Sequence, residues 1–158
     1  MSRPDDAIFA DLVELAIDNL GFGPEFETND EVQAYLHEFN EAERTVVSTW
    51  GVYNEIYNGG FKQLYQNSAA IWAPESVAGF RRIGLGDISA LVEELLTAFP
   101  DWKTAVSRAW RWEFLKNNPK AETLFYGLDE KFCVDDNTFQ AALVKFARGH
   151  TEQLGISA

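Results

Sequence analysis

The sequence predicts an all-α protein, folded as a single compact domain of about eight helices. Three observations lead to this fold class. Apolar residues recur at three- and four-residue spacing in one segment after another, which is typical of amphipathic helices. No segment shows the strict apolar–polar alternation of a half-buried strand. Gly, Pro and Asn fall between the periodic segments, where they end helices.

The first helix is expected from Asp5 to Leu20. Pro4 suits a helix start, and the acidic residues Asp5 and Asp6 follow it, where the helix dipole favours negative charge. On a helical projection, three acidic residues fall within about 60° of one another, opposite the apolar arc. The sequence shows no basic residue placed to neutralise this acidic stripe, which consists of Asp11, Glu14 and Asp18.

A second acidic region follows around a short helix, expected from about Asp30 to His37. Four apolar residues at helical spacing give this region one buried side: Val32, Tyr35, Leu36 and Phe39. Its acidic residues are Glu25, Glu27, Asp30, Glu31 and Glu38. Together with the stripe on the first helix, they are predicted to form a continuous negative face that binds a partner.

A long central helix is expected to begin after Asn40, because Asn40 and Glu43 have the spacing of a capping box. Asn58-Gly59-Gly60 should end it and start a second, short helix, with either Gly59 or Gly60 at positive φ. Phe61 is then expected to fold back on Ile56. Gln63 and Asn67 are expected to hydrogen-bond the backbone at the junction. Four aromatic residues at helical spacing are predicted to lie in the core: Trp50, Tyr53, Tyr57 and Phe61.

Five further helices are expected after residue 73. Pro74 suits the first turn of a helix that ends near Gly84. Asp87 and Asp101 should cap the next two, the second of which is rich in tryptophan and broken at 117–119. The last two helices are expected at about 121–133 and 138–148.

Charge is distributed very unevenly along the chain. Residues 1–58 contain 13 acidic and 2 basic side chains, a net charge of −11 out of −12 for the whole chain. Such asymmetry repels nucleic acid and anionic membranes and attracts basic proteins. We therefore expect a basic protein partner, with no direct nucleic-acid binding and no membrane association. A solvated face that only keeps the protein soluble is the simpler alternative.

Signs of catalysis or of a bound metal are weak. The two histidines, His37 and His150, lie far apart in the sequence, and no Cys/His cluster has the spacing of a zinc site. Nucleotide-binding and nucleophile motifs are missing. We expect no enzyme activity, no catalytic residue, no cofactor and no metal. Cys133, the single cysteine, fits a reducing cytoplasm.

The segment 55–68 resembles the hallmark motif of the bacterial DNA-mimic protein domain family, Glu-x-x-Asn-Gly-Gly-Phe-x-Gln followed by an aromatic residue and Asn-Ser. The matching residues are Glu55, Asn58, Gly59, Gly60, Phe61, Gln63, Tyr65, Asn67 and Ser68. Three later segments are also similar to the family: 80–84, 95–100 and 128–132. The resemblance covers a core of about 45–150, which an acidic region of about 1–44 precedes.

This resemblance implies an all-helical fold with no known cofactor and no assigned catalytic residues. It also implies that some members present carboxylates in place of DNA phosphates and occupy the DNA-binding surface of a partner, here a basic protein such as a transcription regulator. An inhibitor or immunity-type protein that binds a basic partner unrelated to DNA is an alternative, and so is a homodimer. The motif itself is expected to be structural. A small-ligand site at Glu55, Asn58 and Gln63 remains the other interpretation.

Overall fold

The computed structural model describes residues 3–20, 26–99 and 107–157, and over these ranges it contains nine α-helices, one 3-10 helix and no strand. The prediction of an all-α fold is therefore confirmed. The elements are α1 (Asp5–Asn19), α2 (Asn29–Leu36), α3 (Glu41–Gln66), η1 (Ser68–Trp72), α4 (Ala73–Arg82), α5 (Gly86–Ala98), α6 (Arg108–Asn117), α7 (Ala121–Lys131), α8 (Asp136–Arg148) and α9 (Thr151–Leu154).

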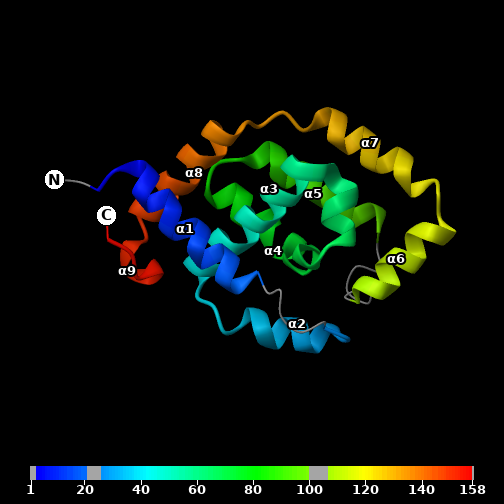
Figure 1. Ribbon diagram of the computed structural model, residues 1–158, viewed down its shortest axis with the longest axis horizontal. Helices are drawn as coiled ribbons and strands as arrows, with labels where there is room; N and C mark the ends of the chain where they lie inside the picture. The colour runs from blue at the N-terminus through cyan, green and yellow to red at the C-terminus, as the bar shows by residue number, and fades with distance from the viewer. Residues whose placement is uncertain (1–2, 21–25, 100–106, 158) are drawn as a thin grey trace.

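The long helix α3 is the axis of the fold, and most other elements pack against it (Figure 1). Helices α4 and α5 pack together beside α3, and α1 lies between α3 and α8 at one end of the molecule. The polypeptide runs along α7 from α6, at the opposite end, back to α8. The two ends of the described chain, Arg3 and Ser157, lie on the same side of the molecule, with α1, α8 and α9.

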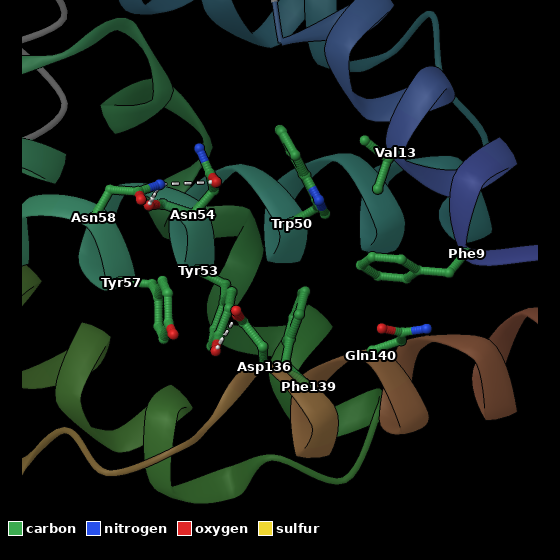
Figure 2. A pocket seen from close by; sticks show the side chains of 10 residues that line it. All are labelled: Phe9, Val13, Trp50, Tyr53, Asn54, Tyr57, Asn58, Asp136, Phe139 and Gln140. Carbon is green, nitrogen blue, oxygen red and sulfur yellow. Dashed lines mark hydrogen bonds between the residues drawn. The ribbon is translucent and has the colours of Figure 1, made fainter. Parts of the chain in front are cut away.

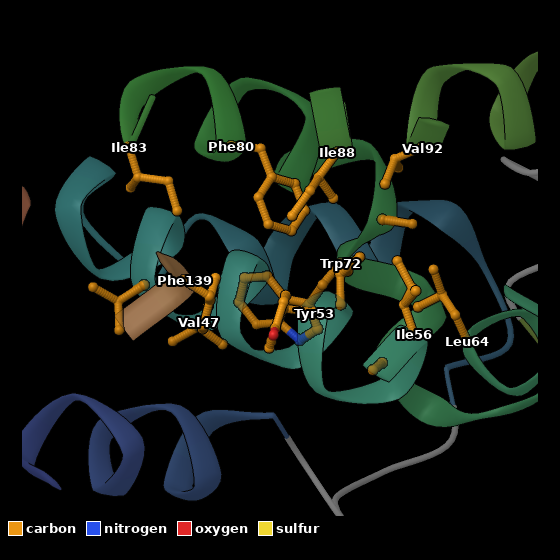
Figure 3. Packing of buried hydrophobic residues seen from close by; sticks show 14 of the residues in the cluster. Val47, Tyr53, Ile56, Leu64, Trp72, Phe80, Ile83, Ile88, Val92 and Phe139 are labelled. Carbon is orange, nitrogen blue, oxygen red and sulfur yellow. The ribbon is translucent and has the colours of Figure 1, made fainter. Parts of the chain in front are cut away.

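The core forms where α3, α4, α5, α8 and η1 turn apolar side chains toward one another (Figure 3). Fully buried residues include Leu64 of α3, Phe80 of α4, Val92 of α5 and Trp72 of η1, all at 0% exposure. Each such side chain contributes about 1.5–3 kcal/mol through removal of apolar surface from water. This burial holds α3 in place relative to the helices that pack around it.

Small residues let α3 and α4 approach closely. A Cβ atom added to Gly79 of α4 would lie 2.8 Å from the methyl carbon of Thr49 on α3, too close without movement. Thr49 is fully buried and satisfies its hydroxyl within its own helix, donating to the carbonyl oxygen of Thr45 at 2.6 Å. The contact therefore excludes larger side chains and leaves no polar group of Thr49 unpaired.

Capping interactions confirm the expected start of the central helix. The side chain of Asn40 accepts a hydrogen bond from the Glu43 backbone N–H at 3.0 Å, and Glu43 accepts one from the Asn40 backbone N–H at 2.8 Å. The same reciprocal arrangement of Thr28 and Glu31 begins α2.

Some expected helix starts differ from the structure. Helix α5 begins at Gly86 after Leu85, so Asp87 lies in the first turn and does not cap the helix. Asp101 lies outside the described residues, and α6 is capped by Ser107, whose hydroxyl oxygen accepts the Trp110 backbone N–H at 3.4 Å. Asp87 still adds a negative charge near the positive end of the α5 dipole.

The predicted break at Asn58-Gly59-Gly60 is present as a kink inside α3. Gly59 has φ −158° and ψ 15°, and Gly60 has φ 77° and ψ −177°, so neither residue is helical. Gly60 is thus the residue with positive φ, a conformation that a side chain would strain. The kink redirects the last turns of α3, in which Phe61, Leu64 and Tyr65 are buried.

The four aromatic residues expected in the core do not all lie there. Tyr53 and Phe61 are buried, at 4% and 0% exposure, and Trp50 is half-buried. Tyr57 is 51% exposed, so its assignment to the core was wrong. Its ring stacks on Tyr53 with a centroid distance of 5.6 Å, at the edge where α3 faces the start of α8.

Candidate functional site

The family motif forms a polar network that spans the kink. The Glu55 carboxylate accepts hydrogen bonds from Gln63 Nε2 at 2.7 Å and from Asn67 Nδ2 at 2.9 Å. The expectation that Gln63 and Asn67 hydrogen-bond the backbone was therefore wrong, because their side-chain amides donate to the carboxylate of Glu55, which lies before the kink. These three side chains bind the two halves of α3 to each other.

Asn58 does not join this network. Its Nδ2 donates to the carbonyl oxygen of Asn54 at 2.8 Å and to the side-chain oxygen of Asn54 at 3.0 Å. The structure therefore brings Glu55 and Gln63 together, as the small-ligand interpretation requires, but directs Asn58 away from them.

Two separate motif segments meet at the kink. The backbone N–H of Phe61 donates to Asp129 Oδ1 at 2.8 Å, although the residues are 68 positions apart. A Cβ atom at Gly60 would lie 2.6 Å from Asp129 Oδ2, so this approach requires glycine. The segment 128–132 thus supplies a hydrogen-bond acceptor for the kink in segment 55–68. This relation gives the motif a structural role.

The carboxyl end of α3 is held by a buried arginine that sequence reasoning missed. Arg111 of α6 is 2% exposed and donates from Nε to the Tyr65 carbonyl at 2.6 Å and from Nη2 to the Asn67 carbonyl at 2.8 Å. A cation is favourable at this end of a helix. Burial lowers the pKa of Arg111 to about 10, which still leaves it charged at neutral pH. Its sequence neighbours Trp110 and Trp112 are exposed at 40% and 50%, so the local sequence carries no signal of its burial.

The acidic stripe of α1 is partly neutralised, contrary to expectation. Arg3 forms a salt bridge with Asp11 and donates a second hydrogen bond from Nη2 to Asp11 Oδ1 at 2.9 Å. The arginine precedes the helix and its side chain extends forward along the first two turns to Asp11, a contact that helical projection does not reveal. The hydrogen bond from Arg3 lowers the pKa of Asp11.

The other predicted acidic residues fall into three groups. Glu31 serves as a cap, because its carboxylate accepts the backbone N–H of Glu27 at 2.8 Å and of Thr28 at 3.1 Å, which lowers its pKa. Glu25 lies outside the described residues. Within the described parts of the chain, five predicted face residues are exposed and make no ion pair: Glu14, Asp18, Glu27, Asp30 and Glu38.

One hydrogen bond links the two acidic helices. The hydroxyl of Tyr35 on α2 donates to the backbone carbonyl of Asn19, the last residue of α1, at 2.5 Å. This bond connects α2 to the end of α1 at which Asp18 lies, and α2 follows below α1 in Figure 1. The exposed carboxylates of α1 and α2 therefore belong to neighbouring elements.

A cleft of about 310 Å³ opens between α1, α3 and α8 (Figure 2). Sequence reasoning missed it, because its walls come from three helices far apart in the chain. Aromatic rings and short polar side chains line it together: Phe9, Val13, Trp50, Tyr53, Asn54, Tyr57, Asn58, Asp136, Phe139 and Gln140.

Metal ligation and membrane insertion find no support in the described part of the chain. Among residues 3–20, 26–99 and 107–157, no three His, Cys, Asp or Glu side chains lie close enough to hold a metal ion. None of the helices there is both long and apolar enough to span a bilayer.

Comparison with family models decides the relationship of the chain. The model of the DMP19-like proteins matches residues 37–150, well over half of the sequence. The chain belongs to the DMP19-like protein family. The match includes the kink motif, Asp129 and Arg111, and it begins after α1 and α2. Searches of curated proteins and of solved structures found no match.

Proposed function

We propose that this DMP19-like chain is an acidic protein-interaction module that acts as a DNA mimic. It occupies the DNA-binding surface of a basic protein, such as a transcription regulator, and performs no catalysis itself. The observation that carries the proposal is a group of five exposed acidic residues that form no ion pair with the described parts of the chain. We call this group, Glu14, Asp18, Glu27, Asp30 and Glu38, the acidic face. The resemblance of segment 55–68 to the DNA-mimic family supports the same role.

The acidic face stands on a rigid support. Ile8, Leu12 and Ala16 anchor α1 in the core at 0% exposure, so the helix that carries Glu14 and Asp18 is held in place. Glu14 and Asp18 are one turn apart, about 6 Å along the helix axis, or between one and two axial steps of the phosphates in a DNA strand. Carboxylates at such spacing attract the basic surface with which a DNA-binding protein contacts phosphates.

The acidic face also keeps its charge available for a partner. Three other carboxylates of residues 1–58 form salt bridges: Asp5 with Arg148, Asp11 with Arg3, and Glu41 with Arg82. The five residues of the acidic face make no such pair within the described chain, so a basic partner need not displace an internal cation. Attraction of this kind weakens with salt, because mobile ions screen exposed charges.

Binding by two variants with equal net charge tests the proposal. The first, Glu14→Gln/Asp18→Asn/Glu38→Gln, removes three charges from the acidic face. The control, Glu75→Gln/Glu130→Gln/Glu152→Gln, removes three charges from other helices. The parent, immobilised at low salt, captures the basic protein from an extract of the source cells. Purified partner is then titrated against all three proteins across a salt series, with duplex DNA as competitor.

We expect the face variant to bind at least tenfold more weakly and with a shallower salt dependence, while the control binds like the parent. Duplex DNA should displace the partner. Equal loss in both variants would show that only net charge matters, and the proposal would fail. Loss in the face variant without competition by DNA would keep the acidic face as the interface and reject mimicry in favour of a partner unrelated to DNA.

A further inference from the structure

The cleft between α1, α3 and α8 has an aromatic wall with fixed geometry. Tyr53 stacks on Phe139 with a centroid distance of 3.9 Å and an interplanar angle of 3°, and on its other side stacks Tyr57. Figure 2 shows these three rings in a row beneath Trp50, with Phe9 of α1 at the far end. Because Tyr53 and Phe139 are buried and Trp50 and Tyr57 are not, the wall is anchored in the core and open at its rim.

The polar groups of the cleft include several hydrogen-bond acceptors. Asp136, at the start of α8, carries the one carboxylate of the lining and accepts the Tyr53 hydroxyl at 3.0 Å. Asn58 donates from Nδ2 to Asn54, which leaves its amide oxygen able to accept. Gln140 donates from Nε2 to Asp6 at 3.1 Å, and its oxygen lies on the side toward Asp136 in Figure 2.

Charge in the cleft is not balanced by its own lining. None of the ten lining residues is lysine or arginine, so Asp136 has no cation within the cleft. Aromatic faces attract cations, and several acceptors around them favour a ligand with several donors. An anion would be repelled by Asp136. A neutral apolar group would leave the acceptors without partners.

Arginine matches this combination better than lysine does. Its planar guanidinium stacks on aromatic rings and presents five N–H donors in a fixed fork, whereas the lysine ammonium is a compact and strongly hydrated charge. Its three methylene groups can lie along Phe9 and Val13 at the α1 side of the cleft. Arginine is also enriched at the centres of protein interfaces.

We propose that this cleft receives an arginine side chain of the basic partner protein. The guanidinium stacks on the aromatic rim formed by half-buried Trp50 and exposed Tyr57, and donates to Asp136 and to the amide oxygen of Gln140. The cleft then adds a specific anchor to the general attraction of the acidic face. This inference rests on the proposed function for the existence of a basic partner, but not on mimicry of DNA.

Two blocked amino acids test the chemistry of the cleft. N-acetylarginine methylamide carries the guanidinium in the form it has within a chain, and N-acetylcitrulline methylamide is its neutral isostere. Each is titrated into ¹⁵N-labelled protein, and the Trp50 indole and the side-chain amides of Asn54, Asn58 and Gln140 are followed by NMR. We expect saturable shifts for the arginine compound, with a dissociation constant of about 1–10 mM, and at least tenfold weaker binding of citrulline.

Three variants locate the binding. Asp136→Asn removes the carboxylate charge and Tyr57→Ala removes an exposed ring, so each should weaken the arginine compound at least fivefold. Glu130→Gln removes one exposed charge outside the cleft and should bind like the parent. The NMR spectrum of each variant shows whether the fold is intact. If Asp136→Asn changes the fold, Tyr57→Ala alone decides, since that side chain is 51% exposed.

Several results would overturn the assignment. Equal binding of citrulline, equal weakening by Glu130→Gln, or no shifts at 50 mM arginine compound would each do so. Tighter binding of free arginine than of the blocked form would identify a small-molecule site instead. A dimer in sedimentation that Asp136→Asn dissociates would make a second copy of this chain the occupant. None of these results bears on the binding of the partner to the acidic face, so the two proposals fail separately.

Discussion

The carboxylate of Asp129 accepts the backbone N–H of Phe61 at 2.8 Å, which joins α7 to the kink of α3 across 68 residues of sequence. The kink leaves this N–H without its usual helical acceptor, because Gly59 and Gly60 depart from helical geometry. Asp129 replaces the missing carbonyl. The hydrogen bond connects two of the segments that resemble the family, because Asp129 of 128–132 supplies the acceptor for the kink in 55–68.

Substitution of Gly60 by alanine should destabilise the protein by about 2–4 kcal/mol. Part of this cost is strain at φ 77°, and the rest comes from the new Cβ, which would lie 2.6 Å from Asp129 Oδ2 and displace the carboxylate. Gly84→Ala is the matched control, because Gly84 has φ 84° but open space around its Cβ position. Urea unfolding monitored by circular dichroism measures both.

We expect Gly84→Ala to lower the free energy of unfolding only by the cost of backbone strain, about 1–2 kcal/mol. Equal losses in the two variants would mean that the Asp129 contact contributes nothing to the kink.

Phe61 and Tyr57 should respond very differently to truncation. Phe61→Ala should cost about 3–5 kcal/mol, because the ring is at 0% exposure and leaves a cavity. Tyr57→Ala should cost less than about 1.5 kcal/mol, since it removes a half-exposed ring that stacks on Tyr53. The midpoints of thermal unfolding report the difference, and a Tyr57→Ala variant as unstable as Phe61→Ala would contradict the observed exposure.

Local signals in the sequence predicted the fold well. Asn40 and Glu43 identify a helix start by the spacing of two side chains, and Gly59-Gly60 identifies a break by the residue type itself. Both features depend on residues close together in the chain, so helical geometry alone relates them to structure. The all-α class follows from the same kind of evidence.

The contacts that form the sites depend on how distant helices pack, which periodicity does not determine. Tyr57 has the spacing of a core residue, yet it lines the cleft between α1, α3 and α8 and is 51% exposed. Arg111 reads as an exposed base, but α6 places it over the last carbonyls of α3. Arg3 precedes the first helix, so no projection of that helix could assign it to Asp11.

Replacement of Arg111 by methionine should destabilise the protein by about 2–4 kcal/mol. Methionine fills similar space but leaves the carbonyls of Tyr65 and Asn67 without this donor. Arg108→Met serves as control, because Arg108 is exposed and, among the residues that the structure describes, donates a single side-chain hydrogen bond, to the Gln66 carbonyl at 3.2 Å. We expect the control to change the free energy of unfolding by less than about 1 kcal/mol.

Chemical denaturation of both variants gives the comparison. Unchanged or increased stability of Arg111→Met would show that desolvation of the buried charge outweighs its hydrogen bonds.

The pair of Arg3 and Asp11 should make stability depend on pH in a defined direction. The hydrogen bond from Arg3 lowers the pKa of Asp11 below its usual value of 3.8 in the folded protein. A carboxyl group of this kind stabilises the fold fully above its unfolded pKa, and its contribution disappears as pH falls through the folded value. Asp11→Asn should therefore lower the urea midpoint at pH 6, and the difference from the parent should vanish near pH 2.

The control for this prediction is Glu14→Gln, which removes an equal charge from the next turn of α1 at a residue without an ion pair in the described chain. The urea midpoint of Glu14→Gln at pH 6 should equal or exceed that of the parent, because the substitution relieves repulsion among the acidic side chains of residues 1–58. A deficit of Asp11→Asn that persists at pH 2 would assign the loss to packing and not to charge. The expected result also separates the two carboxylates by role: Asp11 stabilises the amino-terminal end of α1, while Glu14 remains available to a basic partner.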